Sequence, residues 1–307
     1  MKNVVGLKHL ASDLGLSIAA ISRALKDYDD ISEETKRKVR LKAIELGYIP
    51  KSLKESHKKI IAILVNSLGS SFFGIIAEKL IEELKKYNCL VHFISTAQNF
   101  ASKENIKEAL ELSADGIISF IIPEDDAYEI ALLYRIPVLL FGRYIEKPKL
   151  NVVYMDDFSG GGIAASYLIE KGANKLCYIG VNEIECSLRR QEGFINGCYK
   201  NNIRDIQIIQ NSEIYKVADF INDGYLWYFC FDDGLANYLI NSQKGKNIHV
   251  IGFNGLSKFF EEYNFFASIS ANYDDMISDT ASILNEKIIN QNNGEAIIVK
   301  HKTELCE

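Results

Sequence analysis

The first fifty residues place apolar side chains at helical spacing. In a first segment they recur at the i, i+3, i+4 and i+7 positions: Leu7, Leu10, Ala11 and Leu14. This spacing predicts a helix, which Gly15 ends. Ser17 and Ser32 can each cap a further helix, because a serine hydroxyl accepts hydrogen bonds from the free backbone N–H groups of a first turn. The pattern therefore predicts a three-helix unit over residues 1–50, with a tight turn between its first two helices.

The second predicted helix has a mixed outer face. Four apolar residues gather on its inner side: Ala20, Ile21, Ala24 and Leu25. The opposite face carries two apolar residues, a serine and an arginine: Ile18, Ala19, Ser22 and Arg23. Such a face suits the major groove of DNA, where the two apolar side chains can contact thymine methyl groups and Arg23 can contact guanine or phosphate. The alternative is a plain three-helix bundle with an exposed isoleucine.

From residue 60 onward, continuous apolar runs alternate with helical segments. Examples of the runs are "IIAILVN" (60–66), "GIISFII" (116–122) and "PVLLFG" (137–142). Uninterrupted apolar strands are typical of parallel sheets with helices on both faces. The alternation restarts after "NVVYMDD" (151–157). About 240 residues with a restart halfway predict two similar lobes rather than one sheet.

Charge is distributed unevenly between the two parts of the chain. The net charge is −6, yet residues 1–59 carry 13 Lys and Arg against 8 Asp and Glu. The remainder carries 22 against 33 and is therefore strongly acidic. A small basic head on an acidic body indicates that only the head binds a polyanion such as DNA.

Several features predict a soluble, cytoplasmic protein. No stretch of about 18 apolar residues is present, so no transmembrane helix is expected. The N-terminal segment "MKNVVGLKHLASD" has neither the apolar core nor the cleavage site of a signal peptide. The six cysteines are scattered without CxxC pairs, and we expect them to be buried and reduced.

Catalytic signatures are scarce. No P-loop, HExxH or GxSxG motif occurs, and the five histidines have no cysteine partners, so neither a metal, a cofactor nor a catalytic residue is predicted. "SGGGIAA" (159–165) lacks the GxGxxG spacing and is interpreted as a glycine-rich helix start. Paired carboxylates such as Asp156–Asp157 and Asp232–Asp233 suggest glycoside hydrolysis. Neighbouring residues of a strand point to opposite faces, however, so such a pair is better suited to accepting hydrogen bonds from ligand hydroxyls.

Residues 10–50, "LASDLGLSIAAISRALKDYDDISEETKRKVRLKAIELGYIP", resemble the DNA-binding headpiece of the LacI/GalR family of bacterial transcription regulators. The resemblance continues through "SSFFGIIAEKLIEEL" (70–84), "ADGIISF" (114–120), "RRQEGF" (189–194), "CFDDGLA" (230–236) and "HVIGFNG" (249–255), and so covers essentially the whole chain. It implies a small all-α helix-turn-helix headpiece (1–50), a shortened hinge (51–59) and an α/β two-lobed, type I periplasmic-binding-protein-like body with parallel sheets (60–307). Three crossovers are then expected between the lobes, near Met155, Asn272 and Lys302.

The resemblance also implies which residues bind. The DNA-binding positions fall on the outer face of the second helix, on two serines near phosphates and on one hinge leucine: Ser17, Ile18, Ala19, Ser22, Arg23, Ser32 and Leu53. The ligand-binding positions are Asn66, Phe72, Arg190, Asp232, Asn254 and Tyr273. Arg190 matches the arginine that commonly contacts the effector, and its alternative role is a salt bridge alone. Gly142 stands where some members have a ligand-binding aspartate.

The hinge departs most from the family pattern. Family members usually carry a segment between headpiece and body that forms a short helix on DNA and wedges a leucine into the minor groove. About four residues are missing before Ser52, roughly one helical turn. Leu53 is then the only candidate wedge. We expect this protein to bend its operator less than its relatives do, and to depend more on the major groove and on lysine–phosphate contacts.

Taken with the resemblance, these patterns predict a homodimeric, ligand-responsive regulator that binds operator DNA and acts as a repressor. The expected effector is a sugar or sugar derivative, with a nucleobase as the alternative. Two other functions stay open. One is a small-molecule (sugar) binding protein with no DNA role, against which the basic head argues. The other is a carbohydrate-active enzyme, which the scarcity of catalytic motifs disfavours.

Overall fold

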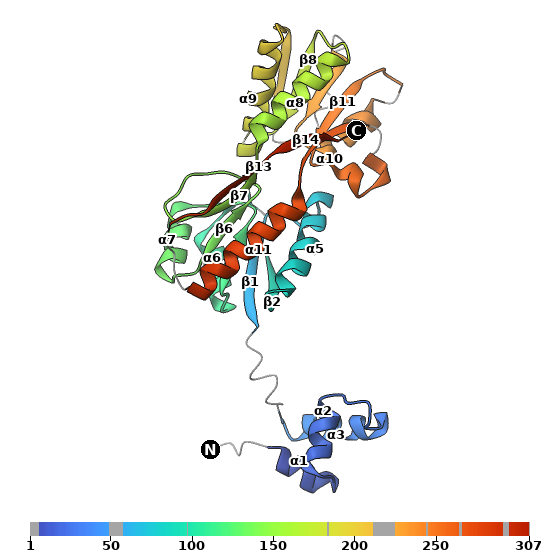
Figure 1. Ribbon diagram of the computed structural model, residues 1–307, viewed down its shortest axis with the longest axis vertical. Coiled ribbons are helices and arrows are strands. Elements are labelled where there is room, and N and C mark those ends of the chain that lie inside the picture. Colours follow the sequence, from blue (N-terminus) through green and yellow to red (C-terminus); the bar gives the residue numbers. More distant parts are fainter. Residues whose placement is uncertain are drawn as a thin grey trace. The chain divides into compact units, whose positions relative to one another are not determined.

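The computed structural model describes residues 6–48, 58–96, 98–182, 184–210, 225–243, 245–263, 266–290 and 295–306. The chain divides into two compact units, Met1–Lys58 and Lys59–Glu307. The first is coloured blue in Figure 1, and the second runs from light blue to red. Each unit has its own apolar core, so each is considered by itself.

The N-terminal unit contains three helices, which are α1 (Leu7–Leu14), α2 (Ile18–Leu25) and α3 (Glu33–Glu45). Gly15 ends α1 in the left-handed region at φ +64°, where glycine has no steric penalty. The helices meet around a small core of five buried apolar residues: Leu10, Ile21, Ala24, Val39 and Ala43. The apolar spacing along the sequence therefore identified the inner faces of these helices correctly.

The first lobe of the body is built on a six-stranded sheet with the order β13-β7-β6-β4-β1-β2. Every neighbouring pair in it is parallel. The strands are β1 (Lys59–Val65), β2 (Cys89–Ser95), β4 (Gly116–Ser119), β6 (Val138–Phe141), β7 (Asn151–Met155) and β13 (Ile298–His301). Two short segments, β3 (Phe100–Ala101) and β5 (Ile122–Pro123), form a separate parallel pair.

Helices cover both faces of this sheet. They are α5 (Ser71–Lys85) and α11 (Tyr273–Asn290) on one face, and α6 (Lys103–Glu111) and α7 (Asp125–Leu133) on the other. Alternate residues of β1 pack into the two layers: Ile61 and Ile63 lie with α5 and α11, whereas Ala62 and Leu64 lie with α6 and α7. Burial on both faces is the reason why the strand sequence is continuously apolar.

The second lobe repeats the plan with the order β14-β12-β11-β10-β8-β9, in which only β14 is antiparallel to its neighbour. Its strands are β8 (Leu176–Gly180), β9 (Ile206–Gln210), β10 (Trp227–Cys230), β11 (His249–Phe253), β12 (Ala267–Ala271) and β14 (Thr303–Cys306). Its helices are α8 (Asp157–Glu170), α9 (Glu185–Lys200) and α10 (Asp233–Ser242), with short 3-10 turns η2 (Leu256–Lys258) and η3 (Glu261–Tyr263).

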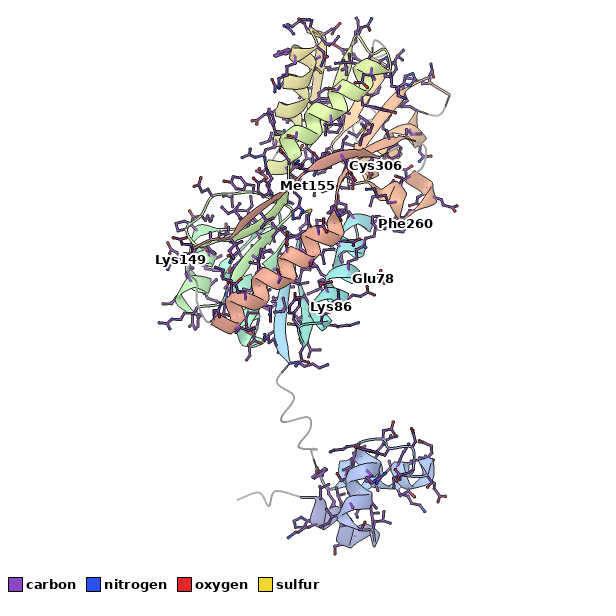
Figure 2. All side chains as sticks on the ribbon, in the orientation of Figure 1. Glu78, Lys86, Lys149, Met155, Phe260 and Cys306 are labelled. Atoms are coloured by element: carbon purple, nitrogen blue, oxygen red, sulfur yellow. The ribbon has the colours of Figure 1, made fainter. Side chains whose placement is uncertain are left out.

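Three crossovers connect the lobes, at the places expected from the resemblance. The chain leaves the first sheet after Met155, returns to it after Asn272 through α11, and crosses again at Lys302 between β13 and β14. Figure 2 shows Met155 where the two lobes meet. The predicted fold class is confirmed. None of the helices in the described part of the chain is long and apolar enough to cross a membrane.

Glycines allow α8 and α9 to pack backbone against backbone. A Cβ atom on Gly161 would lie 2.0 Å from the carbonyl oxygen of Arg190, and one on Gly193 would lie 1.8 Å from that of Phe158. The run "SGGG" is thus a helix start that needs small residues for packing, as interpreted from the sequence. This close approach also brings the first turn of α8 next to Arg190, which matters for the cleft.

Candidate DNA-binding face and ligand cleft

The outer face of α2 is open to solvent. Ile18 is 44% exposed, and Ala19 and Arg23 are also exposed, whereas Ser22 is half-buried. Ile21 and Ala24, on the inner side, are fully buried. An exposed isoleucine on a helix that follows a tight turn is the arrangement required of a helix that enters the major groove. These positions remain predicted DNA contacts.

Arg23 is held by its own headpiece in this structure. Its Nε donates to Asp30 Oδ1 at 3.2 Å, and its second nitrogen lies 2.7 Å from Asp30 Oδ2. The guanidinium also stacks over the ring of Tyr28, 5.1 Å from the ring centroid. Both partners of the ion pair are about half exposed. Because water screens such a pair, the interaction is weak and DNA can replace it at little cost.

The two predicted phosphate-contacting serines cap helices. Ser17 accepts from Ala20 N at 3.1 Å, and Ser32 accepts from Thr35 N at 3.2 Å. Both hydroxyls lie at helix N-termini, where the backbone N–H groups and the helix dipole favour an anion. The seventh predicted DNA contact, Leu53, and the rest of the hinge up to residue 57 lie outside the described residues.

A cavity of about 330 Å³ opens between the two lobes of the body. Five of its lining residues directly follow the carboxyl ends of strands: Asn66 after β1, Phe120 after β4, Gly142 after β6, Phe231 after β10 and Asn254 after β11. This is where open α/β sheets bind ligands, because side chains from several strand ends converge there. The interlobe cavity is therefore the candidate ligand cleft.

The first-lobe wall of the cleft is mainly aromatic. Phe72 and Phe73, at the start of α5, lie 5.7 Å apart between ring centroids, and Phe73 meets Phe120 edge-on at 5.4 Å. Phe141 lies 5.0 Å from Phe120 and extends the cluster. A wall of this kind presents large apolar faces against which the C–H face of a sugar ring or a flat heterocycle can pack.

On the second-lobe wall, Arg190 is 3% exposed and sits in a dense set of contacts. Its Nε donates to Asp157 Oδ1 at 2.7 Å, and a second nitrogen donates to the Phe231 carbonyl oxygen at 2.6 Å. Its guanidinium carbon lies 3.5 Å from the centroid of the Phe253 ring. The side chain therefore forms the ion pair that was the alternative considered from the sequence, and it also lines the cleft, where contact with an effector stays a prediction.

This ion pair carries charge on both partners. Burial alone would lower the pKa of Arg190, but Asp157, together with Cys186 and Tyr178, outweighs it and raises the pKa above its ordinary value. Burial raises the pKa of Asp157 to about 6, and the adjacent guanidinium opposes that rise. At neutral pH the cleft thus contains a charged arginine whose orientation is set by Asp157.

Asp232 and Asn254 complete the polar part of the second-lobe wall. Asp232 is the N-cap of α10, and its carboxylate accepts from Leu235 N at 2.7 Å. Burial raises its pKa. Asn254 is 92% buried and adopts a left-handed backbone at φ +108°, which asparagine tolerates better than most residues. Both side chains are positioned by local backbone structure at a strand end.

Two other predicted ligand residues differ in their placement. Asn66 lines the cleft, and its Oδ1 is buried with no hydrogen-bond partner among the described residues, so it has a free acceptor. Tyr273 is buried, but it does not line this cavity. Its ring packs edge-on against Phe72 at 5.3 Å and supports that side chain from behind. The resemblance places Tyr273 at a cleft position, whereas in this structure it lies behind the cleft residue Phe72.

Several cleft residues were not singled out from the sequence: Ser70, Phe73, Phe120, Phe141, Arg143, Met155, Ile184, Cys186 and Phe231. Their position at strand ends and helix starts was a usable signal, since ligands bind at the carboxyl edge of such sheets. Nothing in the local sequence distinguishes Arg143 from a surface arginine. Only the fold shows that it is 8% exposed and faces the cavity.

The carboxylate pairs separate as strand geometry predicts. Asp156 caps α8 by accepting from Ser159 N, whereas its neighbour Asp157 turns inward to Arg190. Asp233 is fully buried and accepts from Leu256 N at 2.7 Å, and burial raises its pKa to about 7. No group of three His, Cys, Asp or Glu that could hold a metal occurs among the described residues.

A larger hollow, of about 510 Å³, lies at the opposite, amino-terminal ends of β10 and β11. Trp227 and His249 stack there with ring centroids 3.8 Å apart. Strand amino ends rarely supply ligand sites in open α/β sheets. The interlobe cavity, with its converging charged and aromatic groups, is therefore the stronger candidate despite its smaller volume.

No protein-family model matches the chain. The sucrose operon repressor of Lactococcus lactis subsp. lactis is 26% identical over 322 residues, which cover 97% of this chain and 97% of that protein. The HTH-type transcriptional repressor CytR of Escherichia coli strain K12 is 25% identical over 197 residues, 62% of this chain and 58% of that protein.

Solved structures share the fold at lower identity. The lac repressor dimer bound to operator and the anti-inducer ONPF has a TM-score of 0.69 and 17% identity, covering 99% of this chain and 98% of that chain. A LacI family regulator from Enterococcus faecium with bound ribose has a TM-score of 0.72 and 16% identity, covering 81% and 97%. The chain is thus similar over almost its whole length to a sucrose operon repressor, and it shares its fold with solved regulators of the LacI family.

Proposed function

We propose that the protein is a cytoplasmic, homodimeric repressor that binds operator DNA through its headpiece and is controlled by a small molecule in the interlobe cleft. The effector is a sugar or sugar derivative. This class is favoured by similarity to the sucrose and ribose operon repressors of Lactococcus lactis and to regulator structures with bound ribose or cellobiose. The cleft supports it independently, since an aromatic wall faces a polar one.

The proposal rests on two features found in one chain: the exposed outer face of α2 and a cleft lined by both lobes of the body. A ligand that contacts both walls binds one arrangement of the lobes more tightly than another. Ligand binding then changes the free energy of DNA binding, and DNA binding changes the free energy of ligand binding by the same amount, typically about 1–3 kcal/mol. The proposal includes no catalytic step, because the cleft carboxylates are committed to a helix cap and to an ion pair.

The DNA-binding part is tested with Arg23→Ala in the full-length protein. We expect the affinity for operator DNA to fall by about 1–3 kcal/mol, because a specific contact to a base edge is lost. Gel shifts with the DNA upstream of this gene and its neighbours measure the change, and circular dichroism verifies that the headpiece stays folded.

The matched control is Arg37→Ala, which removes the same charge from an exposed position of α3. It should weaken binding less, and to a similar degree for all sequences. Equal losses in the two variants would mean that Arg23 contributes only charge. Unchanged affinity in Arg23→Ala would refute the assignment of α2 as the recognition helix.

A further inference from the structure

Arg143 differs from every other charged group that lines the cleft. It directly follows Gly142 at the carboxyl end of β6, is 92% buried and faces the cavity. The structure gives its guanidinium neither a hydrogen bond nor an ion pair with any described residue. Arg190, across the cavity, is bonded to Asp157 and to the Phe231 carbonyl. The cleft thus holds one paired and one unpaired arginine.

Three carboxylates on the second-lobe side are engaged with other groups. Asp157 pairs with Arg190, and Asp232 accepts from the backbone of α10. Glu185 pairs with Arg189 at 2.6 Å and accepts weakly from Tyr144 N at 3.4 Å. None of these carboxylates forms an ion pair with Arg143.

The position before Arg143 strengthens the contrast. Gly142 has a left-handed backbone at φ +75°, and a Cβ atom added there would meet nothing within 4 Å. The space around an added Gly142 side chain is therefore open, at the position where the resemblance places an aspartate in some relatives. The first-lobe wall consequently presents a cation among phenylalanine rings without a protein anion to match it.

We propose that the effector carries an anionic group, a phosphate ester or a carboxylate on a carbohydrate-sized body, and that Arg143 binds this group. The inference rests on the proposed function, because it names the class of ligand for the same cleft. A planar guanidinium can donate two parallel hydrogen bonds to either anion. Phe120 and Phe141 line the same cavity as Arg143, and the neutral part of the ligand meets Asp232 and Asn254 on the opposite wall.

The test compares each anionic compound with its neutral parent. Full-length protein is titrated with glucose 6-phosphate, fructose 6-phosphate and ribose 5-phosphate, with the parent sugars, and with glucuronate, and binding is followed by calorimetry and thermal shift. Inorganic phosphate serves as the minimal probe. At least one phosphate or carboxylate should bind tenfold or more tightly than its parent, and Arg143→Met should abolish that difference.

Two further variants separate a binding role from a structural one. Arg143→Met should not lower the melting temperature of the ligand-free protein, since Arg143 has no partner among the described residues to lose. Arg189→Met, an exposed arginine outside the cavity, should leave ligand preference unchanged. Gly142→Asp should weaken anion binding through like-charge repulsion, whereas Gly142→Asn, with the same backbone strain and no charge, should weaken it less.

The outcomes distinguish this inference from the proposed function. If a neutral sugar binds as tightly as its phosphate and releases the protein from DNA, the repressor function stands and the anionic effector is refuted. If no anionic compound is preferred over its parent, or if Arg143→Met lowers the melting temperature, the inference is equally refuted. Operator binding by Arg23→Ala is measured separately and does not depend on the ligand, so it tests the proposed function alone.

Discussion

The headpiece and the cleft each contain an arginine held by an aspartate, and the two ion pairs differ in their access to water. Arg23 and Asp30 are about half exposed, so water screens the pair and either partner can separate from the other. Arg190 and Asp157 are almost completely buried, so neither can lose its partner without leaving a bare charge in the interior. The first arrangement suits a side chain that must change partners, and the second suits one that must keep its orientation.

The same contrast separates two kinds of binding surface. The face of α2 consists of four residues within one helix, and its shape depends on little beyond that helix and its core. The cleft collects residues from distant parts of the chain, and its shape depends on two lobes and three crossovers. A substitution in the headpiece should thus act locally, whereas one in the cleft should act on stability as well as on binding.

The largest expected effect is that of Arg190→Met. Removal of the guanidinium leaves Asp157 buried and unpaired, so the free energy of unfolding should fall by about 3–5 kcal/mol. Urea unfolding of the full-length protein, followed by circular dichroism, measures the loss. The double variant Arg190→Met/Asp157→Leu should recover much of it, because both charges are then gone. A loss below 1 kcal/mol in the single variant would mean that the pair is no more coupled than the exposed one.

The sequence position of Arg190 near a strand end predicts that Arg190→Ala abolishes the effector response but not DNA binding by the unliganded protein. The structure adds a stability cost, because the arginine is also the partner of Asp157. Loss of the response in that variant is therefore informative only when the fraction of folded protein has been measured.

An intermediate effect is expected from the helix caps, which occur in both regions. Ser17→Ala in the headpiece and Asp232→Ala in the body each remove a side-chain acceptor for a backbone N–H. Each should lower the free energy of unfolding of its unit by about 1 kcal/mol. Asp232→Asn should restore most of that loss, since asparagine caps as well as aspartate does. If Asp232→Asn were as unstable as the alanine variant, the charge rather than the cap would be what α10 requires.

The smallest effect is expected from Asp30→Asn. The exposed ion pair with Arg23 contributes well under 1 kcal/mol to the free energy of unfolding, so thermal unfolding of the headpiece should barely change. Its removal frees the guanidinium, and binding to unrelated DNA at low salt should rise slightly. Gel shifts with operator and non-operator DNA compare the two affinities. A large gain for operator alone would show that Asp30 withholds Arg23 from the groove.

Local patterning accounted for the elements that depend on neighbours in the chain. Helical spacing predicted the three headpiece helices, and Ser17 and Ser32 cap α2 and α3 as expected. The apolar runs predicted parallel strands, because burial on both faces favours apolar residues at successive positions. The glycine run was also interpreted correctly as a helix start. Its small residues are needed because α8 packs against backbone atoms of Arg190 and Phe194, which belong to α9.

Short-range chemistry controls the fold class, the exposed face of α2 and the family resemblance, and these could be predicted from the sequence. Of the six cysteines expected to be buried and reduced, five are buried free thiols, whereas the free thiol Cys306 is only half-buried. The fold was needed to show which strand ends share a cavity, that Tyr273 stands behind Phe72, and that Arg190 is paired while Arg143 has no partner among the described residues. The physical reason is that burial and pairing are properties of residues far apart in the chain. A buried charge is recognised only when every group that could neutralise it has been placed around it.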